Sequence, residues 1–344
     1  MCGPTRFEVD ARYEFIKMMG GGAYGVVAAA KDNDTGKKVA IKKIPNAFED
    51  LVDAKRIYRE IKLLKFFNHE HIIKLFDIIR PDNPKTFNDI YIITELMETD
   101  LHRVIYSKQP LSEEHIQYFV YQILKATQHM HSANVIHRDM KPSNVLLNKQ
   151  CDVKICDMGL GRGFEEEDES KTEYVVTRWY RAPEVILNAS DYSKAIDVWA
   201  VGCIFAELLG RTAIFPGESY LDQIQRIVSV LGTPTSEDTA YISNEKALQY
   251  LKSLPKRSKQ SWAKIFPKSP PLAIDLLGKM LVFNPNLRYN VDECLDHPYF
   301  ADLRSEDENI LADTPFDWGF DNFKLSAEKL RELIYKEALK FHPL

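Results

Sequence analysis

The residues with the clearest chemical meaning lie in the middle of the chain, between positions 139 and 157. Asp139 can accept a proton from a hydroxyl group or orient the attacking oxygen, and Lys141 can offset charge on a transferring phosphoryl group. Asn144 and Asp157 carry oxygen atoms of the kind that Mg²⁺ prefers. One Asp or Asn alone is most often a cap or turn residue. Several such groups in this order indicate a site for magnesium-assisted phosphoryl transfer.

A second candidate lies near the N-terminus, where Gly20, Gly22 and Gly25 have the spacing G-x-G-x-x-G. Glycines let backbone N–H groups approach phosphate oxygens, but this spacing also opens dinucleotide-binding helices and occurs in ordinary hairpins. Residues 26–31 run into an Asp-, Asn- and Gly-rich turn, so the helix that a dinucleotide-binding unit needs cannot follow. A strand–loop–strand hairpin remains, which excludes a nucleotide-dependent dehydrogenase.

Lys42 strengthens the phosphate-binding interpretation of that hairpin. Strand alternation over residues 39–42 places Ala40 and Lys42 on the same face. An ammonium group turned inward needs an anionic partner, because burying it alone is very costly. Glu60 is the natural candidate, since it borders the apolar stripe of a helix predicted around residues 54–64. The alternative, a surface lysine with only its stem covered, is disfavoured by the glycine-rich loop upstream.

The elements that must position these groups change in character along the chain. Up to about residue 95, β-prone runs predict strands near 13–19, 26–30, 38–44, 72–79 and 90–95. Beyond residue 98, helical spacing predominates, starting after the N-cap Ser112 and recurring at 195–209, 220–231, 271–280 and 326–341. The sequence therefore predicts an α+β fold with a small β-rich lobe and a larger α-helical lobe.

Composition narrows the class further. The 344 residues carry a formal net charge of −5, which argues against a role in coating nucleic acid. The five cysteines lack metal-type spacing, and no apolar run approaches the length of a membrane span. We therefore expect a cytoplasmic monomer, with the nucleus left open as a second location, and neither nucleic acid nor membrane as a partner.

Taken together, the motifs resemble those of eukaryotic protein kinases from about residue 10 to 340. The glycine-rich loop, the lysine motif ending at Lys42, His-Arg-Asp ending at Asp139, the magnesium loop at 157–159 and Ala-Pro-Glu at 182–184 occur in the family's order and spacing. The resemblance implies a bilobal kinase fold that uses ATP and Mg²⁺, with Asn144 and Asp157 as metal ligands. It also implies an ion pair between Glu184 and Arg288.

The same resemblance implies boundaries and nucleotide contacts. The N-lobe would span 1–95, the hinge 96–100 and the C-lobe 101–312, with an insertion at about 240–270 and a C-terminal extension at 313–344. The catalytic set would be Asp139, Lys141, Lys42 and Glu60. The nucleotide would meet Met19, Gly20, Gly21, Gly22, Ala23, Tyr24, Gly25, Val26, Val27, Ala40, Lys42, Thr94, Glu95, Met97 and Asp100.

The triplet Thr172-Glu173-Tyr174 resembles the dual-phosphorylation lip of extracellular-signal-regulated mitogen-activated protein (MAP) kinases. This implies activation by an upstream dual-specificity MAP kinase kinase that phosphorylates Thr172 and Tyr174. Arginines would then grip the added phosphates, because convergent guanidinium groups need an anion. The resemblance assigns Arg59, Arg138 and Arg162 to phospho-Thr172, and Arg178 and Arg181 to phospho-Tyr174.

Partners follow from the same likeness. Substrates would carry Ser or Thr followed by Pro. In related kinases the arginine matching Arg181 bonds a backbone carbonyl near residues 175–176, which leaves no acceptor for the N–H of the next substrate residue, and proline has no N–H to leave unpaired. Asp302, Glu306, Asp307 and Glu308 approximate the family's acidic docking patch for phosphatases and substrates with basic docking motifs, although a solvated acidic loop fits equally well. For the acidic run 165–169 we prefer a solvated loop to the alternative, in which its carboxylates occupy the arginine cluster before phosphorylation or attract a basic upstream activator.

The chain also departs from the family's pattern, and two alternative functions remain. Met158 stands where the family usually has phenylalanine, and Thr94 occupies the position beside the adenine where close relatives typically have glutamine. A cyclin-dependent-type kinase is the first alternative, but Tyr174, the insertion and the final helix favour the MAP class. A pseudokinase scaffold is the second, although it would need a missing Lys, Asp or Asn, and none is missing.

Overall fold

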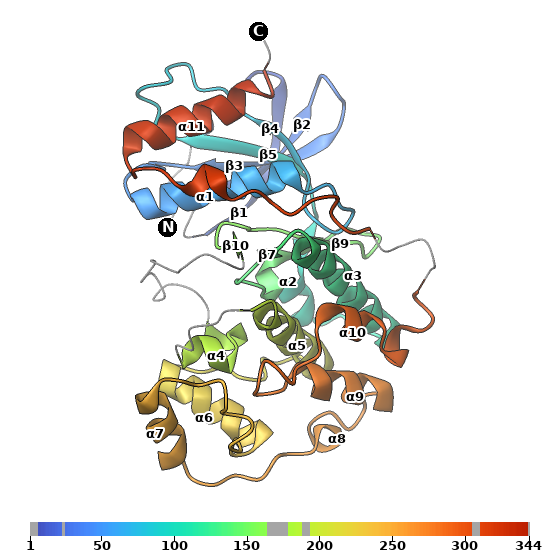
Figure 1. The fold of residues 1–344 in the computed structure, drawn as a ribbon. Coiled ribbons are helices and arrows are strands. Elements are labelled where there is room, and N and C mark those ends of the chain that lie inside the picture. The colour runs from blue at the N-terminus through green and yellow to red at the C-terminus, as the bar shows by residue number, and fades with distance from the viewer. Residues whose placement is uncertain (1–5, 23–24, 164–177, 188–192, 305–309, 343–344) are drawn as a thin grey trace. The chain divides into compact units, whose positions relative to one another are not determined.

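In this computed structural model the structure describes residues 6–22, 25–163, 178–187, 193–304 and 310–342 (Figure 1). Contacts within the chain divide it into two compact units: the first comprises residues 1–98, 157–160 and 317–344, and the second comprises 99–156 and 161–316. Strands dominate the first unit and helices the second, which confirms the predicted α+β class. Over the described ranges, every helix is too short or too polar to cross a lipid bilayer.

The first unit is built on a five-stranded antiparallel sheet with the order β1-β2-β3-β5-β4. Its core gathers alternate residues from one face of these strands, among them Val39, Ile41 and Ile93. The strands are β1 (Tyr13–Gly22), β2 (Gly25–Asp32), β3 (Lys38–Ile44), β4 (Leu75–Ile78) and β5 (Ile90–Glu95).

Two helices from opposite ends of the chain pack together in the first unit. Helix α1 (Leu51–Phe66) begins at Asp50, whose side chain accepts hydrogen bonds from the first-turn N–H groups. Helix α11 (Ala327–Leu339) contacts α1, and Figure 1 shows the red helix lying along the blue one. The short 3₁₀ turn η4 (Gly319–Asp321) precedes α11 in this unit. The C-terminal segment is thus part of the first unit.

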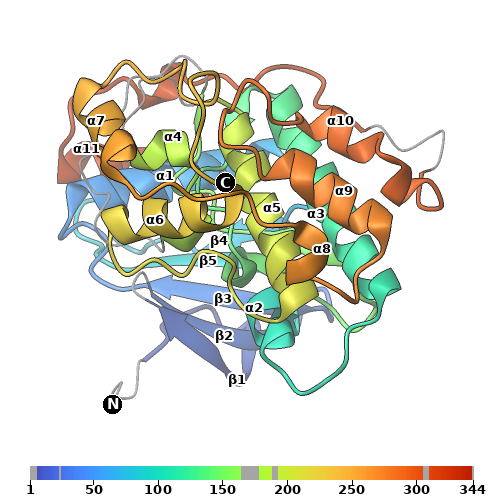
Figure 2. The same ribbon diagram turned by 90° about the horizontal axis from the view of Figure 1, so that it is seen from below.

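The second unit is organised around α3 (Glu113–Ser132) and α5 (Ala195–Gly210), which contact each other. Ser112 caps α3, as predicted, while thirteen consecutive residues of α5 from Ile196 to Leu208 are buried. Figure 2 shows the further helices of this unit around them. These are α2 (Leu101–Ile105), α4 (Pro183–Ile186), α6 (Tyr220–Leu231), α7 (Glu245–Ser253), α8 (Trp262–Ile265), α9 (Pro271–Met280) and α10 (Val291–Leu295).

Short strands and turns of the second unit hold the central motifs. The predicted hairpin is present as β8 (Val145–Leu147) and β9 (Val153–Ile155), and β6 (Thr99–Asp100) pairs with β8. A second small sheet pairs β7 (Val135–Ile136) with β10 (Arg162–Gly163). The remaining 3₁₀ turns are η1 (Pro142–Asn144), η2 (Arg178–Tyr180) and η3 (Pro298–Phe300).

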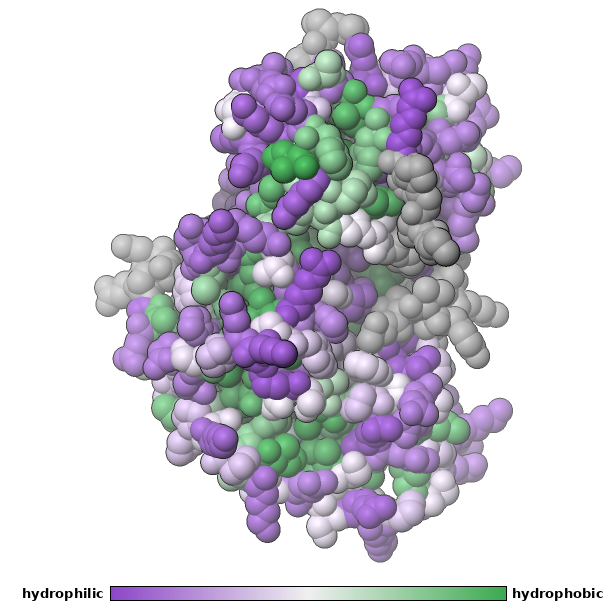
Figure 3. Space-filling model, turned by 180° about the vertical axis from the view of Figure 1, so that it is seen from behind, coloured by the Kyte–Doolittle hydropathy of each residue, from purple (hydrophilic) through white to green (hydrophobic). Residues whose placement is uncertain are grey.

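The surface of each unit mixes polar and apolar side chains (Figure 3). Figure 3 shows apolar residues in green and hydrophilic residues in purple on both units. The exposed apolar side chains of the first unit include Phe15, Ile16 and Met18 of β1. Hydrophilic side chains in purple project from the lower end of the second unit in the same view. Scattered exposed apolar residues are normal on a folded domain and need no separate explanation.

Candidate functional site

Lys42 and Glu60 form the ion pair that the sequence predicted. Lys42 lies in β3 between Val27 of β2 and Ile92 of β5. Its Nζ donates to Glu60 Oε1 at 3.0 Å and to Oε2 at 3.1 Å. The lysine side chain is 27% exposed and the glutamate side chain 9%. The sheet and α1 therefore hold the ammonium group beside a buried carboxylate, and the lysine side chain keeps more exposed surface than its partner.

The glycine-rich hairpin lies next to this pair. Gly22 at the end of β1 faces Gly25 at the start of β2, and Ala23 and Tyr24 lie outside the described residues. Gly25 has a φ of +147°, and a Cβ added to it would lie 2.2 Å from the carbonyl oxygen of Lys43. Glycine is therefore required at this position, because any side chain would collide with the backbone of β3.

The predicted adenine-side residues occupy β5 and the segment after it. Ala40 of β3 faces Thr94 of β5, whose hydroxyl donates to the carbonyl of Glu95 at 3.2 Å. Met97 is buried. Asp100, expected to contact ribose, belongs to the second unit and caps α2 there by accepting from the N–H of Arg103 at 2.9 Å. The ribose contact stays a prediction.

The segment Asp157–Leu160 belongs to the first unit, although its sequence neighbours belong to the second. Met158 is 1% exposed, and Gly159 lies so close to α1 that a Cβ there would be 3.6 Å from the backbone oxygen of Arg56. Asp157 adopts a φ of +61°. A buried Met thus fills the position at which the resembled family usually has phenylalanine. The flexible Met side chain can fill an irregular space.

In the second unit, Asp139, Lys141 and Asn144 converge. Lys141 Nζ donates to Asp139 Oδ2 at 2.8 Å. Asn144 Nδ2 donates to the backbone oxygen of Asp139 at 2.8 Å and to its Oδ2 at 3.2 Å. The Asp139 carboxylate is only 8% exposed, so these donors stabilise its charge where water is scarce. The turn η1 supplies Asn144, and the β8–β9 hairpin follows it directly.

Asp197 anchors this loop, and the sequence analysis missed it. This α5 carboxylate accepts from the backbone N–H of His137 and of Arg138, each at 2.9 Å, and bonds the His131 ring at 2.9 Å. Burial alone would raise the pKa of Asp197, but these hydrogen bonds outweigh burial and the pKa is lowered. A signal was available, because Asp197 is an acid within an apolar helical run.

The donor atoms fit Mg²⁺ in kind. Because the Asn144 amide nitrogen faces Asp139, its carbonyl oxygen is turned away from Asp139. Asp157 offers a carboxylate, and magnesium prefers such oxygen ligands. The two residues belong to different units. The chemistry of the donors therefore supports a metal role for both residues.

Arg59, expected to bind a phosphate, already has an anionic partner in the first unit. Its Nε donates to Asp321 Oδ1 at 2.8 Å, and its Nη2 donates to Asp321 Oδ2. Lys55 Nζ lies 3.0 Å from the same carboxylate. Burial tends to raise the pKa of Asp321, but the bonds from Arg59 and Lys55 outweigh burial and the pKa is lowered.

The other predicted phosphate-binding arginines are placed in the second unit. Arg178 and Arg181 both lie over the ring of Tyr220 at 5.7 Å, so the structure brings them together. Arg162 is buried and donates to the carbonyl of Gly161 at 2.8 Å. Arg138 adopts a φ of +69°. Thr172, Tyr174, the acidic run 165–169 and the docking residues Glu306, Asp307 and Glu308 lie outside the described residues, whereas Asp302 is exposed.

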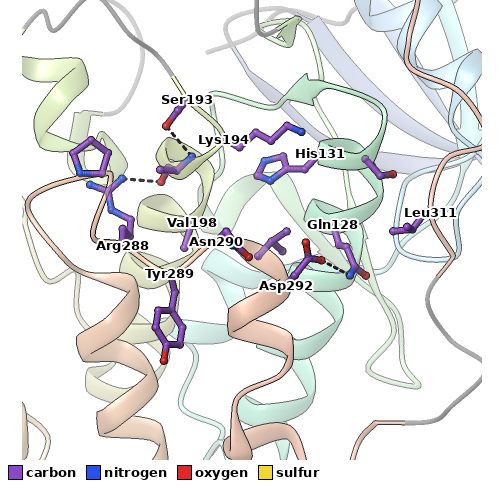
Figure 4. Close-up of a pocket in the computed structure, with 14 residues that line it drawn as sticks. Gln128, His131, Ser193, Lys194, Val198, Arg288, Tyr289, Asn290, Asp292 and Leu311 are labelled. Atoms are coloured by element: carbon purple, nitrogen blue, oxygen red, sulfur yellow. Dashed lines mark hydrogen bonds between the residues drawn. The ribbon is translucent and has the colours of Figure 1, made fainter. Parts of the chain in front are cut away.

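A cavity of about 490 Å³ opens elsewhere in the second unit (Figure 4). Arg288 lies in its wall and makes the predicted ion pair, with Nη1 2.7 Å from Glu184 Oε1. Gln128 and Asp292 also line the cavity, and Gln128 donates to Asp292 Oδ1 at 2.6 Å. These polar groups bond to each other, so the cavity wall is a structural network and carries none of the predicted catalytic residues.

Comparisons with known proteins agree with the motifs. The protein kinase domain family matches residues 13–300. Extracellular signal-regulated kinase 1 of Dictyostelium discoideum is 51% identical over 340 residues, which cover 98% of this chain and 64% of that protein. Mitogen-activated protein kinase 1 of Oryza sativa subsp. japonica is 52% identical over 338 residues, covering 98% and 84%. Mitogen-activated protein kinase 6 of Arabidopsis thaliana is 52% identical over 338 residues, covering 98% and 85%.

Proposed function

Because the chain belongs to the protein kinase family and is a serine/threonine kinase of the MAP kinase class, we propose that it phosphorylates Ser and Thr residues followed by proline. The arrangement of Asp139, Lys141 and Asn144 carries the phosphoryl-transfer part of this proposal, because a desolvated carboxylate held by two donors can orient a hydroxyl nucleophile.

Each group has a distinct part in the proposed reaction. Asp139 accepts the hydrogen bond of the substrate hydroxyl and takes up its proton. Lys141, 2.8 Å from that carboxylate, stabilises negative charge on the transferring phosphoryl group. Lys42, held by Glu60, contacts phosphate oxygens of ATP from the first unit.

Protein kinases use ATP and Mg²⁺, and we assign the metal ligands of this chain to Asn144 and Asp157. When bound, Mg²⁺ offsets the charge of the triphosphate. The hydrogen bonds of Asn144 Nδ2 to Asp139 fix the amide so that its oxygen is the atom offered to the metal. The glycine-rich hairpin supplies backbone N–H groups to the phosphates, and Thr94, Glu95 and Met97 border the adenine.

We further propose that phosphorylation of Thr172 and Tyr174 by an upstream MAP kinase kinase switches the enzyme on. Arg178 and Arg181, which already share the Tyr220 ring, would receive phospho-Tyr174. Arg138, Arg162 and Arg59 would receive phospho-Thr172. Asp321 bonds to Nε and Nη2 of Arg59, so the phosphate would share the guanidinium through Nη1.

The test compares wild type with Asp139→Asn on a Ser-Pro peptide and on the matching Ser-Ala peptide, after phosphorylation of both sites is verified by mass spectrometry. We expect a loss of about 10²- to 10⁴-fold in kcat for Asp139→Asn, because a general base contributes that much. Asp82→Asn, which changes an exposed carboxylate, is the control. Equal activity of Asp139→Asn and wild type would refute the catalytic assignment, and equal use of both peptides would refute the proline preference.

A further inference from the structure

A basic surface occupies the insertion that joins α7 to α9. Between residues 252 and 268 the chain has six cationic side chains and no acidic one, although its formal net charge is −5. All six are exposed, and none forms an ion pair with a carboxylate in the part of the chain that the structure describes. They are Lys252, Lys256, Arg257, Lys259, Lys264 and Lys268, named here the insertion patch.

The backbone beneath the insertion patch is fixed. The N–H of Thr233 donates to the carbonyl of Arg257 at 2.9 Å, and the N–H of Arg257 donates to Thr233 Oγ1 at 2.8 Å. Gln260 N donates to the carbonyl of Val230 at 2.8 Å. Gly232, with a φ of +86°, allows this close approach, because a Cβ there would lie 2.8 Å from Lys259 N. The cations are thus displayed by an ordered segment along the end of α6.

Like charges on the insertion patch repel one another unless an anion offsets them. Exposed cations that lack a counter-charge repel one another wherever they lie within the screening length of about 8 Å at physiological salt. An anionic partner would relieve that repulsion and would be steered toward this end of an otherwise acidic chain. The patch also contains none of the residues assigned to phosphoryl transfer.

The aromatic and apolar residues of the insertion indicate which anion fits. Trp262 and Phe266 are 6% and 7% exposed, so the patch offers no aromatic surface for stacking nucleic-acid bases. Residues 252–268 also expose no large apolar side chain that could enter a lipid interface. An acidic polypeptide needs neither feature, and an extended one can follow the irregular segment 255–260.

We propose that the insertion patch binds an acidic segment of a partner protein, rich in Asp, Glu or phosphorylated Ser. The lysines and Arg257 contact its carboxylates or phosphates through their side chains alone. The hydrogen bonds that hold this segment against α6 and the residues just after it come from the backbone of Arg257 and from Gln260, so they do not use these cationic side chains. Neutralising the side chains therefore removes the contacts and leaves the fold in place.

The experiment measures binding of a fluorescent 20-residue Glu/Ser peptide by anisotropy, for wild type and for the variant Lys256→Gln/Arg257→Gln/Lys259→Gln/Lys264→Gln. The control Lys37→Gln/Lys38→Gln/Lys74→Gln/Lys85→Gln changes four exposed lysines of the first unit and has the same net charge. We expect the patch variant to bind at least about tenfold more weakly at 0.05 M salt, the control to bind like wild type, and the difference to narrow at 0.5 M salt.

Three results would overturn the proposal. The first is equal binding by the patch variant and wild type, and the second is an equal loss in the control, which would indicate a net-charge effect only. The third is patch-dependent binding of a 20-base-pair duplex or of phosphatidylserine vesicles more tightly than the peptide. Binding requires no phosphoryl transfer, so failure here is distinct from failure of the proposed function, and both variants should phosphorylate a Ser-Pro peptide like wild type.

Discussion

Adjacent residues of α1 form two ion pairs that differ in how they meet solvent. Glu60 bonds Lys42 of β3, and Arg59 bonds Asp321 of η4. The Lys42 side chain is 27% exposed, whereas the side chains of Arg59 and Asp321 are each 9% exposed. We call Lys42–Glu60 the open pair, because its cationic side chain is the more exposed, and Arg59–Asp321 the closed pair, because both of its side chains are mostly buried.

This difference separates a group suited to chemistry from a group suited to anchoring. A lysine whose side chain keeps exposed surface can contact an additional anion, while its glutamate holds it in place. A pair that is desolvated at both ends holds its elements together, and breaking it leaves a buried charge without compensation. We therefore expect changes at Lys42 to affect catalysis first and changes at Asp321 to affect folding first.

The closed pair also determines where the open one can lie. Arg59 and Asp321 are 262 positions apart, and Glu337 of α11 adds a second bond to α1, 2.6 Å from Lys65 Nζ. The C-terminal segment thus fixes α1, and α1 carries Glu60. The orientation of Lys42 depends on residues near the far end of the chain.

Among changes to these two ion pairs, Lys42→Arg should have the largest effect on activity. Arginine keeps the positive charge that pairs with Glu60, but its planar guanidinium places its N–H donors at different positions from the lysine ammonium. Misplacing a group that contacts the ATP phosphates in this way should lower activity about 10²-fold. The free energy of unfolding should change by less than about 1 kcal/mol. Steady-state kinetics and urea unfolding measure the two quantities. Lys38→Arg, at the exposed start of β3, is the control and should leave both unchanged.

Asp321→Asn should show the reverse pattern. Removing the carboxylate leaves Arg59 buried without its counter-charge, which should lower the free energy of unfolding by about 3 kcal/mol. Activity measured well below the midpoint of unfolding should fall less than in Lys42→Arg. Asp313→Asn, an exposed carboxylate eight residues earlier, should unfold like wild type. If Asp321→Asn unfolded like that control, the anchoring role of the closed pair would be wrong.

The closed pair should also make stability depend on pH in a defined direction. The pKa of Asp321 in the folded chain is lowered from its ordinary value of 3.8. The carboxylate therefore stabilises the fold fully above that value, and its contribution is lost as pH falls through the lower folded pKa. Thermal unfolding of wild type and Asp321→Asn should differ most near neutral pH and converge below about pH 4. A difference that grows on acidification would contradict the assignment.

Lys55→Gln should have the smallest effect. Lys55 Nζ lies 3.0 Å from Asp321, but its side chain is 22% exposed and Arg59 still neutralises the carboxylate. Partly exposed ion pairs contribute little, so we expect a loss of about 0.5–1 kcal/mol in urea unfolding. A loss as large as that of Asp321→Asn would show that Lys55, and not Arg59, carries the pair.

Local patterns in the sequence predicted much of the site. Helical spacing placed Glu60 beside a buried stripe, and strand alternation turned Lys42 inward, which led directly to their ion pair. The hairpin at 145–155 and the cap at Ser112 also follow from neighbouring residues. Asp197 could not be assigned in this way, because its partners lie some 60 positions earlier.

The sequence by itself determined which residues could do the chemistry, because glycine spacing, strand and helix period, and the order of polar groups are properties of short stretches of chain. The tertiary structure decided what holds them: Asp197 beneath the Asp139 loop, and Asp321 and Glu337 on α1. The physical reason is that a buried charge selects its partner by proximity in the folded chain, and proximity over hundreds of positions leaves no local pattern in the sequence.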